Sequence, residues 1–181
     1  MASRYEDELW EQVPDRRRPP RDLGDWVASL EPARHALDVG CGDGVVSAVV
    51  PAEQLTLADV SPVALGRARA RLPEAEAVEL EPDEPLPFAD GSFDLVVCTE
   101  AIEHVHDLQL FLSEVRRVLE PRGRLALTTP ANRLLIRPPD PLSPHMRHLT
   151  KRSLRALLEG MGFELLELRR RRGALFAVAA R

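Results

Sequence analysis

Cysteine is scarce in this sequence, since Cys41 and Cys98 are the only two among 181 residues. Two thiols give no disulfide framework, which favours a reducing compartment. The first residues lack the basic and then apolar regions of a secretory signal, and no apolar run approaches the roughly 18 residues that span a bilayer. We therefore expect a cytoplasmic protein with no membrane partner.

Lysine is scarcer still, because Lys151 is the only lysine among 24 basic residues and all the others are arginine. The net charge is −5, and an acidic chain is not built to attract a polyanion. This balance argues against a nucleic-acid partner. Hydrophobic residues make up 44% and charged residues 29% of the chain, which is typical of a globular protein, and the length fits one domain.

Strand and helix patterns alternate from residue 34 onward. Seven short apolar runs predict strands at 36–39, 55–59, 75–80, 93–98, 125–129, 163–168 and 174–179. Alternation with helices predicts a parallel sheet covered on both faces, and the short turn between the last two strands makes the final strand antiparallel. We expect an α/β fold, a three-layer α/β/α sandwich with a mostly parallel seven-stranded sheet. Residues 1–33 are expected to form an N-terminal arm or cap, and residues 34–181 the main domain.

Helix signals mark the ends of several elements. Ser61 followed by Pro62 is a good helix start, and Thr150 is a suitable cap for a late helix. Residues 44–50 can make about two helical turns before Pro51 stops them. Residues 121–123, Pro-Arg-Gly, are expected to end the helix that contains Leu108 to Val118.

Ligands of such sheets bind outside the carboxyl ends of the strands. The segments at those ends, residues 38–44, 59–61, 99–104 and 129–132, contain nearly every polar residue suited to chemistry, together with residues 143–148. Gly40, Gly42 and Gly44 form a G-x-G-x-G loop that lets a ligand approach the backbone. Val45 stands where the dinucleotide motif has its third glycine, which argues against NAD. Asp59 ends the second strand, where a carboxylate can accept both hydroxyls of a ribose.

Four segments together resemble the class I S-adenosylmethionine-dependent methyltransferases. Residues 37–44 (LDVGCGDG) look like the first motif of that family, and residues 58–61 (ADVS) like its second acidic turn. Residues 86–96 (LPFADGSFDLV) and 118–125 (VLEPRGRL) are similar to the runs that enter its fourth and fifth strands. The match covers about residues 34–181 in the right order and spacing.

The resemblance implies S-adenosylmethionine as the cofactor. By it, Asp38 and the backbone of the glycine loop hold the methionine part, and the Thr99 backbone lies by the methionine amine. Asp59 binds the ribose hydroxyls, and Val60 packs on the adenine. Relatives commonly have an aspartate that meets the adenine amine where this chain has Pro82, so the adjacent Asp83 is the candidate substitute.

The sulfonium methyl is already activated, so the protein must align an acceptor and remove its proton where necessary. His104 is the expected base, and His145 is expected to flank the acceptor with it. A second interpretation stays open. Glu100, Glu103, His104 and His145 could hold a divalent metal, a pattern similar to that of small-RNA 3′-terminal 2′-O-methyltransferases. Of the two, we favour chemistry without a metal.

The sequence therefore predicts methyl transfer to an oxygen or nitrogen of a small molecule. One alternative is a metal-dependent RNA 3′-terminal 2′-O-methyltransferase, and another is a non-catalytic, cofactor-binding partner subunit. The arm carries Tyr5, Trp10 and Trp26, and we expect it to lie over the carboxyl edge and close the acceptor pocket. The sequence gives no oligomeric state.

Overall fold

The computed structural model of the chain describes residues 7, 8, 10–13, 18–131 and 149–181. One seven-stranded sheet forms its centre, with the strands in the order β3-β2-β1-β4-β5-β7-β6. The strands are β1 (Ala33–Val39), β2 (Ala52–Asp59), β3 (Glu76–Glu79), β4 (Phe93–Thr99), β5 (Leu119–Pro130), β6 (Glu164–Arg171) and β7 (Ala174–Ala180). The pairs among β1 to β5 are parallel, and β7 is antiparallel to both β5 and β6. The predicted seven-stranded, mostly parallel sheet with an antiparallel last strand is confirmed.

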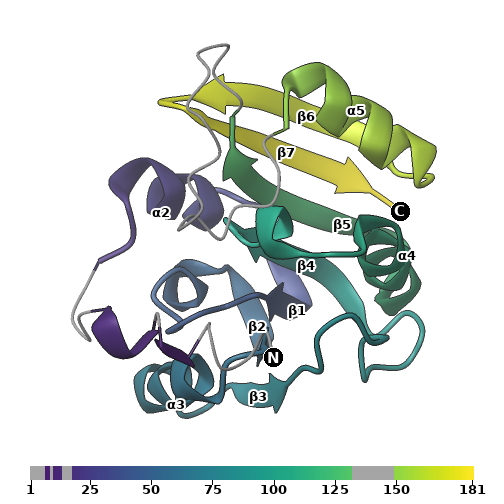
Figure 1. Cartoon of the computed structure of the whole chain (residues 1–181). Helices are drawn as coiled ribbons and strands as arrows, with labels where there is room; N and C mark the ends of the chain where they lie inside the picture. Colours follow the sequence, from purple (N-terminus) through teal and green to yellow (C-terminus); the bar gives the residue numbers. More distant parts are fainter. Residues whose placement is uncertain (1–6, 9, 14–17, 132–148) are drawn as a thin grey trace.

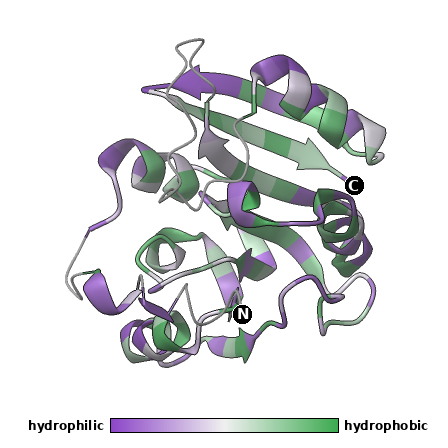
Figure 2. Cartoon of the chain, viewed as in Figure 1, coloured by the Kyte–Doolittle hydropathy of each residue, from purple (hydrophilic) through white to green (hydrophobic). Residues whose placement is uncertain are grey.

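Helices cover both faces of this sheet (Figure 1). They are α2 (Arg21–Ala28), η1 (Ser47–Val49), α3 (Pro62–Arg71), η2 (Ile102–His104), α4 (Leu108–Val118) and α5 (Lys151–Gly160). Buried residues of α4 and α5 share one core with β4, β5 and β7, whereas α2 and α3 pack on the opposite face. Hydrophobic residues accordingly concentrate in the central strands and on the inner sides of the helices (Figure 2). This arrangement is the predicted three-layer sandwich.

Local signals fixed two of the helix starts. The Ser61 side chain accepts a hydrogen bond from the Ala64 amide at the start of α3, with Pro62 at the first helical position. Thr150 and Ser153 form a reciprocal capping box at the start of α5. Both predicted caps are confirmed.

Two local predictions were wrong. Residues 44–50 form no two-turn helix but only the single 3-10 turn η1, and the chain leaves it at Val50 in an extended conformation. The strand predicted at 125–129 begins earlier, at Leu119 directly after α4, so residues 121–123 lie within it although the helix ends before them as expected. The register jumps from Phe93↔Leu119 to Leu95↔Arg124, so residues 121–123 form a bulge within the strand.

The proposed division between an arm of 1–33 and a domain of 34–181 stays a prediction. Helix α2, which falls in the arm, packs Trp26 and Val27 into the core, and Trp26 makes an edge-to-face contact with Phe176 at 5.1 Å. Within the part of the chain that the structure describes, no helix has the length and apolarity needed to cross a membrane.

Candidate cofactor and acceptor site

The loop after β1 is shaped by glycines at positions where a side chain would not fit. Gly40 and Gly42 have φ angles of 73° and 56°, in the left-handed region that other residues rarely adopt. A Cβ at Gly40 would lie 2.5 Å from the Cβ of Ala101, and one at Gly42 would lie 2.5 Å from the Trp10 ring. The amide of Gly40 donates to the Ala58 carbonyl at 2.8 Å, which ties the loop to the end of β2. The loop therefore requires glycine, because Ala101 and Trp10 lie directly against its backbone.

Asp59 is fixed by backbone amides at the end of β2. Its two carboxylate oxygens accept hydrogen bonds from the amides of Gly42 at 2.8 Å and Ser61 at 2.9 Å. The side chain is buried, and burial raises its pKa although both amides favour the charged form. Each carboxylate oxygen keeps a second lone pair, so the oriented group can still accept from a diol.

Asp38 presents a buried oxygen with no protein partner. Its Oδ2 accepts from the Ser47 hydroxyl at 2.6 Å, whereas Oδ1 is buried without a hydrogen bond. Burial raises the pKa of Asp38 to about 7. A buried carboxylate oxygen without a donor is costly, and an ammonium group from a ligand would remove that cost. The glycine loop, Asp59 and Asp38 thus fit a ligand with a ribose and an amine, as S-adenosylmethionine has.

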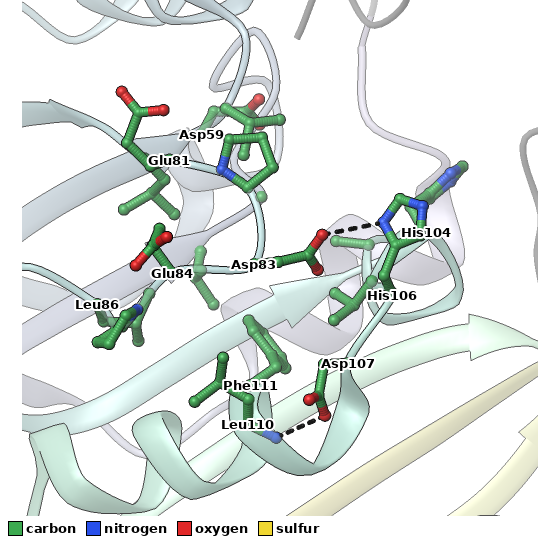
Figure 3. Close-up of a pocket in the computed structure, with 18 of the residues that line it drawn as sticks. Asp59, Glu81, Asp83, Glu84, Leu86, His104, His106, Asp107, Leu110 and Phe111 are labelled. Atoms are coloured by element: carbon green, nitrogen blue, oxygen red, sulfur yellow. Dashed lines mark hydrogen bonds and ion pairs between the residues drawn. The ribbon is translucent and has the colours of Figure 1, made fainter. Parts of the chain in front are cut away.

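A cavity of about 440 Å³ opens at the carboxyl edge of the sheet. It brings together seven of the predicted site residues, namely Gly40, Gly42, Asp59, Val60, Asp83, Glu100 and His104. Its volume is in the range of small-molecule sites. Asp38, Gly44, Thr99 and Glu103 are not among its lining residues, and His145 lies outside the described residues. Figure 3 shows the wall of residues 81–86 facing the segment that leads into α4.

The wall opposite the glycine loop is held by α4. Glu114 accepts from the Leu86 amide at 2.9 Å, and Arg117 donates to the carbonyls of Leu86 at 2.9 Å and Phe88 at 2.8 Å. Arg117 also pairs with Glu114 at 2.7 Å, which lowers the pKa of that carboxyl. The pair therefore ties the end of the proline-rich segment to α4 beside the cavity.

The segment after β4 does not carry Glu100, Glu103 and His104 on one helix. Glu100 has a φ angle of 51° and lies before η2, so it shares no helix with Glu103. Glu100 and His104 line the cavity, whereas Glu103 is buried and accepts from the Thr129 hydroxyl at 3.1 Å. Burial, aided by the neighbouring charge of Glu100, raises the pKa of Glu103 to about 7.

The metal interpretation is not decided by this geometry. Among the described residues, no three His, Cys, Asp or Glu side chains form a group that could hold an ion. The fourth member of the predicted set, His145, falls in 132–148, outside the described part. Metal binding by Glu100, Glu103, His104 and His145 therefore stays a prediction.

Trp10 and His106 line the cavity through contacts that the sequence did not predict, although the arm with Trp10 was expected to lie at this edge. Trp10, from the arm, lines the cavity against Gly42. His106 lies at the mouth with its Nδ1 3.5 Å from Asp83 Oδ2, and Figure 3 shows the Asp83 carboxylate pointing toward it. His106 lies only two residues after His104, the predicted base. Its place in the segment that follows β4 could have marked it as a candidate cavity residue. For Trp10 no spacing or motif links the arm to the loop.

The methyltransferase-domain family matches residues 37–127 of this chain, which contain the glycine loop, Asp59 and His104. A probable S-adenosylmethionine-dependent methyltransferase of Mycobacterium tuberculosis (strain H37Rv) is 36% identical over 136 residues, covering 72% of this chain and 49% of the relative. Norajmaline N-methyltransferase of Rauvolfia serpentina is 32% identical over 127 residues, covering 66% of this chain and 44% of the relative. The chain thus spans about half the length of the curated relatives it matches.

Solved structures share the whole fold at low sequence identity. A chain from the complex that contains the Haloferax volcanii methyltransferase activator Trm112 superposes with a TM-score of 0.78 at 18% identity, over 97% of this chain and 96% of that one. The likeness extends beyond the matched family segment to the antiparallel end of the sheet. With its family match and this fold, the chain belongs to the class I S-adenosylmethionine-dependent methyltransferases.

Proposed function

We propose that this protein transfers the methyl group of S-adenosylmethionine to a nitrogen or oxygen of a small molecule. The observation that supports the proposal is that Asp59, Gly40, Gly42 and His104 line the same cavity. Direct methyl transfer requires the cofactor and the acceptor to bind side by side in one cavity. We call the part with Asp59 and the glycine loop the cofactor half and the part with His104 the acceptor half. When bound, S-adenosylmethionine supplies a methyl group already activated on a sulfonium.

We assign each site residue a role in binding the cofactor or in accepting the proton. Asp38 accepts from the ammonium of the methionine part, the Thr99 backbone lies by that amine, and Asp59 accepts from the ribose hydroxyls while Val60 packs on the adenine. Asp83 is the candidate partner of the adenine amine. In the reaction the acceptor forms a bond to the methyl carbon, the sulfur keeps the electron pair of the broken bond, and His104 takes the acceptor's proton.

The charge of the cavity supports an acceptor that is neutral or cationic. Among the described residues that line the cavity, none is Lys or Arg, whereas six are carboxylates: Asp59, Glu81, Asp83, Glu84, Glu100 and Asp107. A cavity lined by carboxylates attracts cationic ligands and repels anionic phosphate groups. This balance weighs against the RNA alternative and favours an amine or an uncharged hydroxyl compound.

Titration calorimetry with S-adenosylmethionine and its demethylated product tests the cofactor half. Asp59→Ala should weaken binding by about 10–100-fold, because it leaves the ribose hydroxyls unpaired at a cost of about 1–3 kcal/mol. Asp25→Ala, at a well-exposed position of α2, is the matched control and should bind like the wild type. Equal affinity in Asp59→Ala, or a preference for NAD, would contradict the proposal.

Transfer of a labelled methyl group to panels of amines, hydroxyl compounds and RNA tests the acceptor half. We expect label in a small amine or hydroxyl compound. Label found only in the 3′-terminal nucleotide of RNA would establish the RNA alternative. Tight cofactor binding without transfer to any acceptor would favour the non-catalytic partner subunit.

A further inference from the structure

The described part of the arm lies on the cofactor half of the cavity. Figure 1 shows this short purple segment beside α3. The Trp10 atoms Cζ2 and Cη2 lie 2.5 and 2.6 Å from the point that a Cβ of Gly42 would occupy, so the ring rests directly on the glycine backbone. Trp10 also lines the cavity that contains Asp59 and Val60. This placement agrees with the expectation that the arm lies at the carboxyl edge, and the Trp10 ring contacts the glycine loop there.

Three hydrogen bonds attach the same segment to α3 and its N-cap. Asp7 accepts from the Ser61 hydroxyl and, at 3.4 Å, from the Val63 amide, at the start of that helix. Arg67 donates to the Val13 carbonyl at 2.6 Å. Ser61 also donates its amide to Asp59, so the arm is attached to the same turn that orients the ribose-binding carboxylate. The arm is therefore hydrogen-bonded to the turn of residues 59–61, which contains the ribose-binding carboxylate.

The indole is neither in the main core nor fully exposed. Trp10 is half-buried and belongs to none of the hydrophobic core clusters, whereas Trp26 is 4% exposed and packs against Phe176. A large apolar ring that is left partly open at a cavity gains further burial when a flat ligand enters beside it. The free energy of that burial is available to ligand binding instead of folding.

We propose that Trp10 is a cofactor-binding residue whose indole closes the cavity over bound S-adenosylmethionine, and that the arm must leave α3 before the cofactor can exchange. This inference rests on the proposed function, because it takes S-adenosylmethionine as the ligand. It assigns the arm to cofactor retention, with Trp10 as the contact and Asp7 as the attachment. Closure of this kind slows dissociation more than it changes the chemistry.

Tryptophan fluorescence tests the contact, because the chain has only two tryptophans. Trp26→Phe leaves Trp10 as the sole reporter, and Trp10→Phe leaves Trp26 as the matched control. On titration with S-adenosylhomocysteine we expect a saturable change in the first variant, with the same Kd as calorimetry gives, and no change in the second. Binding seen by calorimetry without any change in Trp10 fluorescence would overturn the inference.

Substitution tests the closure. Trp10→Ala should weaken binding of S-adenosylhomocysteine about tenfold, mostly through faster dissociation, and Trp10→Phe should restore most of the loss. Asp7→Ala should also speed dissociation, although it leaves the cavity residues intact, whereas Asp25→Ala should not. A thermal melt of each variant verifies folding. Wild-type dissociation rates in both Trp10→Ala and Asp7→Ala would overturn the closure, whereas no binding to the wild type would refute the proposed function itself.

Discussion

Replacing Asp38 with asparagine should stabilise the ligand-free protein at alkaline pH and weaken its hold on the cofactor. Asp38 is 1% exposed, and burial raises its pKa to about 7 from the usual 3.8. The folded state therefore binds an extra proton between about pH 4 and pH 7. The stability linked to that proton is fully present below about pH 4 and is lost as the pH rises through 7.

The size of the effect follows from the pKa. One unit of pKa corresponds to about 1.4 kcal/mol, so the ionised Asp38 lowers the free energy of unfolding by about 4 kcal/mol at pH 8. In a domain of this size each kcal/mol moves the Tm by roughly 2–4 °C. Asparagine has the same shape and can still accept from Ser47, but it carries no charge. We expect Asp38→Asn to melt roughly 10 °C above the wild type at pH 8 and close to it at pH 4.

Thermal melts from pH 4 to pH 8, without ligand, measure this difference. Glu103, whose pKa is also about 7, is unchanged in the variant, so the comparison isolates Asp38. Asp94 provides a control of opposite sign: burial alone would raise its pKa, but the amides of Arg34 and His35 donate to it and lower the pKa. Asp94→Asn should therefore destabilise the protein at neutral pH.

Calorimetry at pH 8 measures the other half of the prediction. A hydrogen bond between charged groups contributes about 1.5–3 kcal/mol, so Asp38→Asn should bind S-adenosylmethionine about 10–100-fold more weakly. A variant no more stable than the wild type at pH 8 would refute the ionised, unpaired state of Asp38. Unchanged affinity would refute its pairing with the ammonium.

Three further predictions concern the cavity. Gly42→Ala should lower cofactor affinity at least about tenfold and reduce the Tm, because its φ of 56° and its 2.5 Å approach to Trp10 leave no room for a Cβ; calorimetry and a melt measure both. His104→Ala should lose roughly 10²–10⁴-fold in turnover, and the wild type should keep its activity in EDTA; activity restored only by Mg²⁺ or Mn²⁺ would instead establish the metal interpretation. Arg117→Leu should raise the acceptor KM more than it lowers kcat, because it frees the Leu86 and Phe88 carbonyls of the cavity wall; steady-state kinetics with the identified acceptor checks this, and an unchanged KM would refute it.

The elements that the sequence predicted well depend on local signals. Ser61 with Pro62 and Thr150 mark helix starts through contacts within three residues, and the apolar runs of the strands need no distant partner. The helix predicted at residues 44–50 did not form, because the segment is too short for its helical pattern to decide the conformation. Pro51 and the extended Val50 end the segment after a single 3-10 turn. In the same way, the bulge at residues 121–123 depends on the register with β4, which only pairing determines.

In the candidate site too, the residues that lie at strand ends were predictable, whereas those that depend on tertiary contacts were not. The glycine loop and Asp59 were predictable because both lie at the carboxyl ends of neighbouring strands, where a parallel sheet gathers them. The burial of Glu103 was not predictable, since it depends on the left-handed Glu100 that directs the segment before η2. The arm was expected at this edge, but the contact of Trp10 with Gly42 was not predictable, because it joins two segments that share no strand, helix or motif.

The place of β7 in the sheet has a consequence for synthesis on the ribosome. β7 pairs with β5 along seven residue pairs, from Arg124↔Ala180 to Pro130↔Ala174, and so lies between β5 and β6. Until residues 174–180 leave the ribosome, β5 has an open edge of unpaired backbone amides and carbonyls, which can recruit a foreign strand. The hairpin of β6 and β7 therefore closes the sheet in one late step, and a nascent chain paused before it is the species most exposed to aggregation.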